Sequence, residues 1–172
     1  DPSLVEVILQ QSSEIVRLAH VIISRTKHGF VCANAGVDLS NVEDGYVTIL
    51  PDDPDASAER IRKTIRDRLG VDVAVIVTDT QGRPFRQGCV GVAIGVAGMK
   101  PLLDMRGRRD LHGRELRVTV TSQADAIAAA AVAVMGESDE GTPAVLVKGA
   151  VYERGKSTAR ELVRPRDQDL FR

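Results

Sequence analysis

The sequence predicts an α+β fold in which helices pack on a mixed sheet. Apolar residues at helical spacing and short β-branched runs succeed one another along the 172 residues. A single glycine at position 70 separates an amphipathic stretch from a strongly apolar run, a helix-to-strand connection typical of layered folds. With 43% hydrophobic residues the chain can bury a core of its own, so we expect one domain over residues 1–172.

The first elements follow from local pattern. Apolar residues at near-helical spacing behind Pro2 predict a helix from the start of the chain to about Arg17. The β-branched residues 21–23 and the run 30–32 predict a hairpin, and residues 46–50 predict a further strand.

The second helix has clear signals at both ends. Apolar residues lie four apart between Ile61 and Leu69, which predicts one buried helix face. Asp55 or Ser57 is expected to cap its first turn, because both follow a Pro-rich turn and can accept orphan backbone N–H groups. Gly70 is expected to end it.

The middle of the chain alternates strands and loops. Residues 71–77 are apolar and β-branched and predict a buried strand that ends in a loop over residues 78–88. Residues 90–98 alternate Gly and Ala with Val and Ile, which predicts a strand where another backbone comes close. Residues 105–113 are expected to form a loop, and residues 116–121 a strand.

The last third begins with a strong helix signal. Ser122 is expected to cap an alanine-rich helix that runs to Met135 and packs tightly, with a subunit partner as one candidate neighbour. An acidic turn and a strand over residues 144–148 follow. Ser157 is expected to cap a short helix that runs to Val163, and residues 170–171 are expected to pack back.

Composition excludes some classes of function. Lys plus Arg number 23 and Asp plus Glu 24, a net charge of −1 that argues against a nucleic-acid-binding protein. No apolar run is long enough to span a bilayer, so we expect a soluble, cytoplasmic protein without a membrane partner. Cys32 and Cys89 are expected to be reduced thiols.

Two acidic residues follow predicted strands and suggest a metal site. Asp38 and Asp79 each have hydroxyl neighbours, Ser40 and Thr80, and such oxygen ligands suit a hard cation such as Mg²⁺ or Mn²⁺. The other interpretation, that each aspartate only caps a turn, stays open.

Arg83 and Arg86 lie in the predicted loop beyond Asp79 and are candidate catalytic clamps for phosphate oxygens or an anionic substrate, or else ordinary surface arginines. Neither a Walker lysine motif nor a G-x-G-x-x-G motif occurs. A bound nucleotide would therefore have to be held by a metal and by loops.

Several blocks together carry a family resemblance. They are HGFVCANAGVDLSNV at 28–42, LPDDPDASAERIR at 50–62, TDTQGRPFRQG at 78–88, AIGVAG at 93–98, and the pattern Gly107, Asp110, Gly113. In this order they resemble the coenzyme F420-0:L-glutamate ligase family, also called F420:γ-glutamyl ligase. The likeness extends from the first helix to the strand after Pro143. An N-terminal segment that in relatives supplies part of the guanine-nucleotide site is expected to be missing here.

The resemblance implies roles for particular residues. Asp38, Asp79 and Thr80 would hold divalent cations near nucleotide phosphates, and Asn41 would contact the nucleotide. One glutamate of a C-terminal nucleotide-binding loop would complete the metal shell, and we favour Glu137 over Glu140. The residues of that loop are Met135, Gly136, Glu137, Ser138, Asp139, Glu140, Gly141 and Thr142.

The resemblance also implies a fold and a reaction. The fold would consist of two intertwined α+β domains in a homodimer. The reaction would use GTP as co-substrate, with Mg²⁺ or Mn²⁺ and optionally a monovalent cation, to join L-glutamate to coenzyme F420-0 through an acyl phosphate. Residues 106–110 are a candidate contact for the other substrate. Two alternatives remain: an inactive, truncated module for metal binding and dimerisation, and a related metal-dependent enzyme acting on another acidic substrate.

Overall fold

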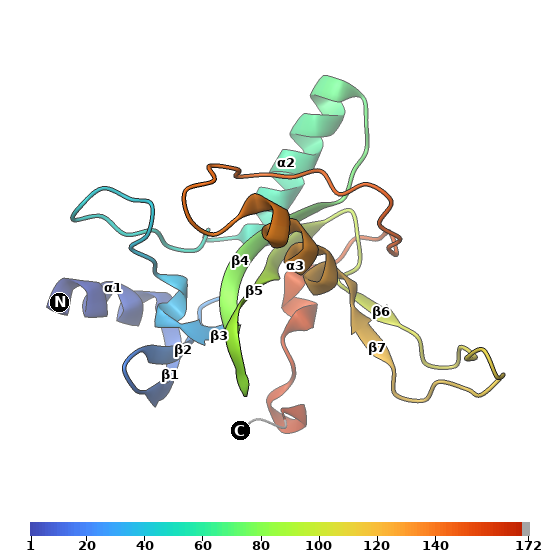
Figure 1. Cartoon of the computed structure of the whole chain (residues 1–172), viewed down its shortest axis with the longest axis horizontal. Helices are drawn as coiled ribbons and strands as arrows, with labels where there is room; N and C mark the ends of the chain where they lie inside the picture. The colour runs from blue at the N-terminus through green and yellow to red at the C-terminus, as the bar shows by residue number, and fades with distance from the viewer. Residues whose placement is uncertain (170–172) are drawn as a thin grey trace.

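The computed structural model describes residues 1–169 and confirms the α+β class. Its strands form three small antiparallel sheets, whereas the sequence suggested one mixed sheet. The middle of the chain forms the centre of the molecule, and the N-terminal sheet lies to one side of it (Figure 1). The expectation for residues 170–171 falls outside the described residues.

The first sheet replaces part of the predicted first helix. Helix α1 ends at Gln11, and the expected continuation to Arg17 is wrong, because residues 12–18 form strand β1. The Ser12 hydroxyl donates to Ile8 O at 2.7 Å and the Ser13 hydroxyl to Thr26 O at 3.0 Å, so both serines favour leaving the helix. The elements are α1 (Pro2–Gln11), β1 (Ser12–Leu18), β2 (Ile22–Thr26) and β3 (Val31–Ala33), with the sheet in the order β1-β2-β3.

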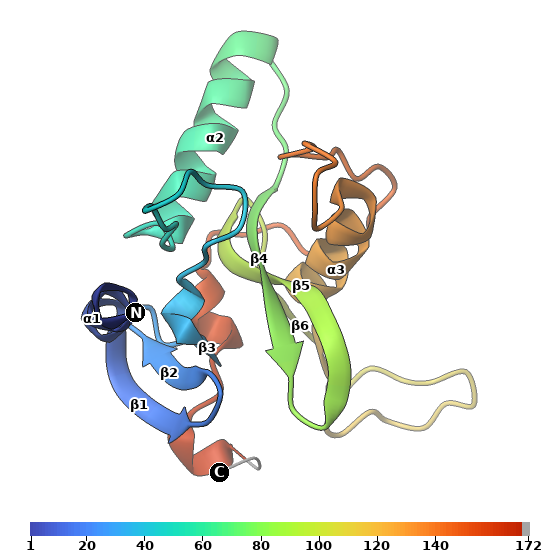
Figure 2. The ribbon, with the colours of Figure 1, turned by 60° about the vertical axis from the view of Figure 1, so that its left-hand side comes forward.

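The central sheet is one long hairpin flanked by two helices (Figure 2). Its strands are β4 (Val75–Arg83) and β5 (Arg86–Ala97), and the helices are α2 (Pro54–Leu69) and α3 (Gln123–Met135). The predicted strand at 71–77 therefore starts late and runs through the predicted loop, because residues 75–83 pair with β5. The core cluster contains Ala93, Val96, Met99, Ala124, Ala128 and Ala159.

Small residues in β5 let both helices approach closely, as expected. A Cβ on Gly91 would lie 2.8 Å from Val132 Cβ and 2.9 Å from Ala128 O, both on α3. A Cβ on Gly95 would lie 2.8 Å from Pro54 Cβ at the start of α2. The alanine-rich helix α3 therefore packs tightly against β5 of the same chain.

The helix caps are partly as predicted. Ser122 caps α3, and Gly70 ends α2 in the left-handed conformation with φ 70°. The expected α2 cap at Asp55 or Ser57 is wrong, since Asp53 accepts the N–H of Ala56 at 2.8 Å. Asp55 is used elsewhere: its Oδ1 accepts the N–H groups of Val96 at 2.8 Å and of Ala159 at 2.9 Å. It thereby ties α2 to β5 and to the C-terminal segment.

Three predicted strands form only in part or not at all, and residues 46–50 and 144–148 have no partner strand in the described part of the chain. Residues 46–50 contribute only an isolated bridge between Asp38 and Thr48. Residues 116–121 overlap only the start of β7, and residues 144–148 are irregular. The third sheet pairs β6 (Leu102–Asp104) with β7 (Val120–Ser122).

Short 3₁₀ turns complete the architecture. They are η1 (Asn34–Gly36), η2 (Ala159–Leu162) and η3 (Arg166–Gln168). The helix predicted over residues 157–163 is thus a single 3₁₀ turn, and Ser157 does not cap it, because Thr158 occupies that position without a side-chain bond. Across residues 1–169, none of the helices has the length and apolar character that crossing a membrane requires.

Candidate functional site

A left-handed turn delivers Asp38 to the surface. Asn34, Ala35 and Gly36 all have positive φ, at 51°, 55° and 74°. A Cβ on Gly36 would lie only 2.7 Å from Leu50 Cγ, so both the backbone angle and the close approach favour glycine there. Asp38 follows this turn after Val37 and is held by two backbone hydrogen bonds with Thr48.

The Asp38 carboxylate is held by the residues that follow it. It accepts the Leu39 N–H at 2.7 Å, the Ser40 N–H at 3.1 Å and the Ser40 hydroxyl. The bond from the Ser40 hydroxyl is the main cause that lowers the pKa of Asp38. Asp38 does cap a turn, yet a carboxylate offers about four lone-pair sites, so capping and metal binding are compatible. Ser40 was noted from the sequence only as a hydroxyl neighbour.

Asp79 lies within β4, not beyond its end as the sequence suggested. Its carboxylate accepts a hydrogen bond from Gln81 Nε2 at 3.1 Å. Burial is the largest cause that raises the pKa of Asp79, and the nearby carboxylates of Asp38 and Glu137 raise it further. Two acidic side chains from separate parts of the sequence therefore lie near enough to Asp79 for their charges to act on it.

Cys32 on β3 is buried near Asp79. Burial, and then the charge of Asp79, raise the pKa of the Cys32 thiol to about 12. The thiol therefore stays neutral at ordinary pH and adds no negative charge near Asp79. Sequence reasoning did not connect the two residues, because β3 and β4 belong to different sheets.

The loop after α3 closes the site from the other side. Thr80 Oγ1 donates to Glu137 Oε1 at 2.9 Å, and Asn41 Nδ2 donates to Ser138 O at 3.0 Å. Glu140 instead folds back over Gly136 and accepts the Ser138 N–H at 2.8 Å. The geometry supports Glu137, rather than Glu140, as the glutamate near Asp79.

The oxygen-bearing side chains of this site are of the type that binds a hard divalent cation. They are the carboxylates of Asp38, Asp79 and Glu137 with the hydroxyl of Thr80, and oxygen ligands are those that Mg²⁺ prefers. Within residues 1–169 no three His, Cys, Asp or Glu side chains are close enough together to hold a metal ion as they stand. Mg²⁺ commonly keeps several waters and takes one or two protein carboxylates, so the set fits the ion without a closed cage.

The predicted arginine clamps lie apart from these carboxylates. Arg83 is four residues beyond Asp79 on the same strand, about 13 Å along it. Its Nη2 donates to Gln87 O at 3.0 Å, and its buried Nε has no hydrogen-bond partner among residues 1–169. Arg86 starts β5 on the other side of the hairpin turn and is exposed. Contact of either arginine with a phosphate stays a prediction.

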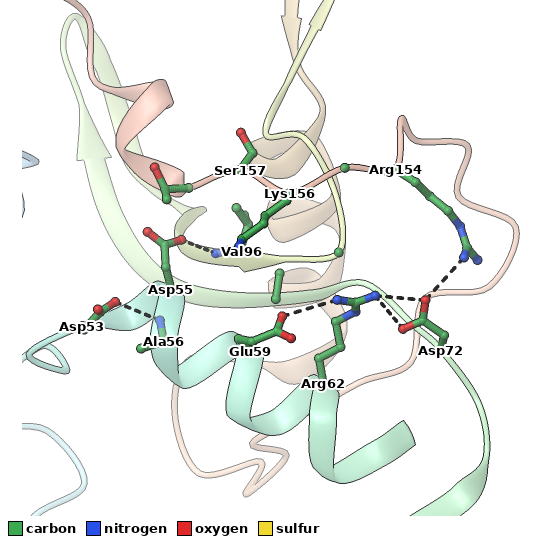
Figure 3. Close-up of a pocket in the computed structure, with 14 residues that line it drawn as sticks. Asp53, Asp55, Ala56, Glu59, Arg62, Asp72, Val96, Arg154, Lys156 and Ser157 are labelled. Atoms are coloured by element: carbon green, nitrogen blue, oxygen red, sulfur yellow. Dashed lines mark hydrogen bonds and ion pairs between the residues drawn. The ribbon is translucent and has the colours of Figure 1, made fainter. Parts of the chain in front are cut away.

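A separate hollow of about 690 Å³ lies between the start of α2, the end of β5 and residues 154–158 (Figure 3). Its charged groups mostly satisfy one another. Arg62 contacts Asp72 at 2.7 Å and Glu59 at 3.4 Å, and Arg154 reaches Asp72 at 3.6 Å. The hollow shares no lining residue with the carboxylate site.

Comparison with known proteins gives a consistent result. The family model for F420-0:Gamma-glutamyl ligase matches residues 1–149. Proteins named coenzyme F420:L-glutamate ligase are 56% identical in Methanothermobacter thermautotrophicus and 52% in Methanopyrus kandleri, over 100% of this chain and 69% and 70% of theirs. The Archaeoglobus fulgidus protein of that name is 46% identical over 98% of this chain and 67% of its own. With the blocks around Asp38 and Asp79 inside the matched range, this chain belongs to the F420-0:γ-glutamyl ligase family.

Proposed function

We propose that the protein joins L-glutamate to coenzyme F420-0 in a reaction that consumes GTP and needs Mg²⁺ or Mn²⁺, and that it works as a homodimer. Family membership and the names of the relatives support the ligase reaction. The closeness of the Asp38 and Glu137 charges to Asp79 is the single observation that supports the use of a metal and a nucleotide triphosphate.

The proposed reaction has two steps. A free carboxylate is a poor acyl donor, so a carboxylate oxygen of F420-0 first attacks the γ-phosphorus of GTP and GDP leaves. The glutamate amine then attacks the acyl carbon, loses a proton and expels phosphate, which forms the amide. Phosphoryl transfer depends mainly on positioning and on stabilising negative charge.

The residues of the site have distinct proposed roles. Asp38, Asp79, Glu137 and Thr80 would hold the cation, whose contribution is to offset charge on phosphate oxygens. Gln81 and Ser40 orient the two aspartates through their hydrogen bonds. Residues 135–142 would line the nucleotide together with Asn41, which the bond to Ser138 already holds against that loop.

Replacement of one carboxylate tests the proposal. Asp79→Asn keeps the shape of the side chain and removes one charge, so turnover should fall by about 10²-fold or more, while GTP binding weakens far less. The assay follows GDP and glutamylated product from F420-0, L-glutamate, GTP and Mg²⁺ or Mn²⁺. The control is Asp67→Asn on exposed α2, which should keep wild-type turnover.

The outcomes separate the alternatives. Wild-type protein that forms neither product contradicts the ligase proposal, and cation binding without turnover would favour the inactive binding module. Glutamylation of another acidic acceptor alone would favour the related enzyme. Full turnover by Asp79→Asn would remove the metal role and leave the ligase proposal intact.

A further inference from the structure

The tip of the β4–β5 hairpin carries an aromatic side chain in an unusual position. Arg83 pairs with Arg86, so Pro84 and Phe85 form the turn between the two strands. Phe85 has φ 60°, a conformation that the second position of a turn normally gives to glycine or asparagine. It is also 90% exposed. Phe85 therefore combines backbone strain with an exposed aromatic ring, and strained residues cluster at sites that bind ligands.

Two arginines flank this ring. Arg83 and Arg86 lie directly opposite each other in the hairpin, and like charges in that position repel. Among residues 1–169 neither of them forms an ion pair. The bond from Arg83 Nη2 to Gln87 O, at 3.0 Å, holds the Arg83 guanidinium at the turn. An anion bound between the two arginines would remove the repulsion, and guanidinium groups suit phosphate oxygens.

The arginines lie on the same face of β4 as the carboxylate site. Side chains alternate along a strand, so Asp79, Gln81 and Arg83 share a face, and the bond from Gln81 Nε2 to Asp79 follows it. The irregular pairing near the turn leaves this alternation intact, because the register skips residues 87 and 88 of β5. Arg83 is about 13 Å from Asp79 along the strand. Figure 2 shows the tip at the end of the hairpin that lies away from α2.

This spacing matches the larger of the proposed substrates. Coenzyme F420-0 consists of a planar deazaflavin ring, a ribityl chain, a phosphodiester and a lactyl carboxylate. About ten bonds join the ring to the acyl carbon, and they span roughly 12 Å when extended. A substrate that lies along this face of β4 with its carboxylate at Asp79 places the phosphodiester within reach of the arginines. The ring then lies at the tip, beside Phe85.

We infer that the hairpin tip is the subsite for the ring and the phosphodiester of F420-0. Phe85 stacks on the deazaflavin ring, because flat aromatic surfaces attract each other in an offset arrangement, and Arg83 and Arg86 bind the phosphodiester. The nucleotide fits this subsite less well, since its proposed loop, residues 135–142, bonds to Thr80 instead. The inference rests on the proposed ligase function and names the residues that hold its acyl substrate.

Equilibrium binding of F420-0 with Mg²⁺ and GDP, a mixture that forms no product, tests the inference apart from turnover. Phe85→Gly removes the ring and suits the φ of 60°, so its melting temperature should equal or exceed that of the wild type. Its Kd for F420-0 should nevertheless rise about tenfold or more. Phe85→Trp keeps a flat ring and should bind F420-0 as the wild type does. Leu69→Ala, at an exposed apolar position of α2, is the control.

Two fragments of F420-0, used as competitors, separate the roles of the side chains. The deazaflavin with its ribityl chain carries the ring without the phosphate, and phospholactate carries the anion without the ring. Phe85→Gly should weaken competition by the ring fragment alone, and Arg83→Gln with Arg86→Gln competition by phospholactate alone, each by about tenfold or more. The charge-matched control is Lys63→Gln with Arg68→Gln on exposed α2.

The outcomes distinguish this subsite from the proposed reaction. Unchanged F420-0 affinity in Phe85→Gly overturns the inference, and so does a loss of GDP affinity alone, which would assign the tip to the guanine ring. Wild-type turnover with an unchanged KM for F420-0 in that variant also overturns the inference and leaves the ligase proposal standing. Tight binding of F420-0 that depends on Phe85, in a protein that forms no glutamylated product, supports the subsite and contradicts the ligase proposal alone.

Discussion

Thr80 and Glu137 are 57 residues apart in the sequence, and the Thr80 hydroxyl donates to the Glu137 carboxylate at 2.9 Å. This bond joins the middle of β4 to the loop that follows α3. It places an acidic residue of the loop beside Asp79. The loop and the strand therefore form one site, and the first prediction concerns which glutamate belongs to it.

Glu137→Gln should weaken Mn²⁺ binding by about tenfold or more, because it removes a negative charge near Asp79. Glu140→Gln is the matched control. Its amide oxygen can still accept the Ser138 N–H, and Glu140 faces its own loop, so Mn²⁺ affinity should stay near that of the wild type. Titration followed by electron paramagnetic resonance measures both affinities. A larger loss of Mn²⁺ affinity in Glu140→Gln than in Glu137→Gln would assign the site to Glu140.

Gly36→Ala should destabilise the protein by roughly 1–3 kcal/mol, because the residue has φ 74° and its new Cβ would meet Leu50 at 2.7 Å. Gly45→Ala has a similar angle, φ 88°, with no heavy atom within 4 Å of the new Cβ, so it should cost less. Urea unfolding of both variants isolates the contact with Leu50. Equal losses would show that only the backbone angle matters at Gly36.

Gly91→Ala should lower the stability of the protein by about 1–3 kcal/mol, because the new Cβ would press on Val132 and on the backbone of α3. Gly82→Ala adds the same methyl group in β4, with open space around it and an ordinary φ, and should change stability little. Adding Val132→Ala to Gly91→Ala should recover part of the loss. A melting temperature for Gly91→Ala equal to that of Gly82→Ala would contradict the close approach of α3.

The two cysteines should differ in reactivity. Cys32 is 8% exposed and the pKa of its thiol is raised to about 12, so it should resist a thiol reagent in the folded protein. Cys89 is exposed and should react at once. One thiol should therefore be titrated at pH 8 without denaturant and two with it. Rapid reaction of both thiols in the folded protein would disprove the burial of Cys32.

The raised pKa of Cys32 also makes the stability of the protein depend on alkaline pH. The ordinary pKa of a thiol is 9.0, and the folded protein raises that of Cys32. The folded state therefore keeps a proton that the unfolded state loses. The stabilising contribution is complete below pH 9 and is lost as the pH rises towards 12. Cys32→Ala should reduce this part of the alkaline loss, as measured by unfolding at pH 8 and pH 10.

The sequence by itself determined the local features of this protein. The cap at Ser122 and the stop at Gly70 could be predicted, because each depends on a few neighbouring residues. The residue types of the site could also be predicted, since carboxylates and hydroxyls at Asp38 and at Asp79 with Thr80 suit a hard cation wherever the chain places them.

Tertiary structure decided how these pieces meet. Pairing with β5 extended β4 through Asp79, against the expected loop, and the packing of α3 on Gly91 placed the following loop beside Thr80. It also separated the aspartates from Arg83, which the sequence had suggested as a neighbour. Bonds between residues dozens of positions apart form only after helices and strands have packed, and no local pattern in the sequence encodes that packing.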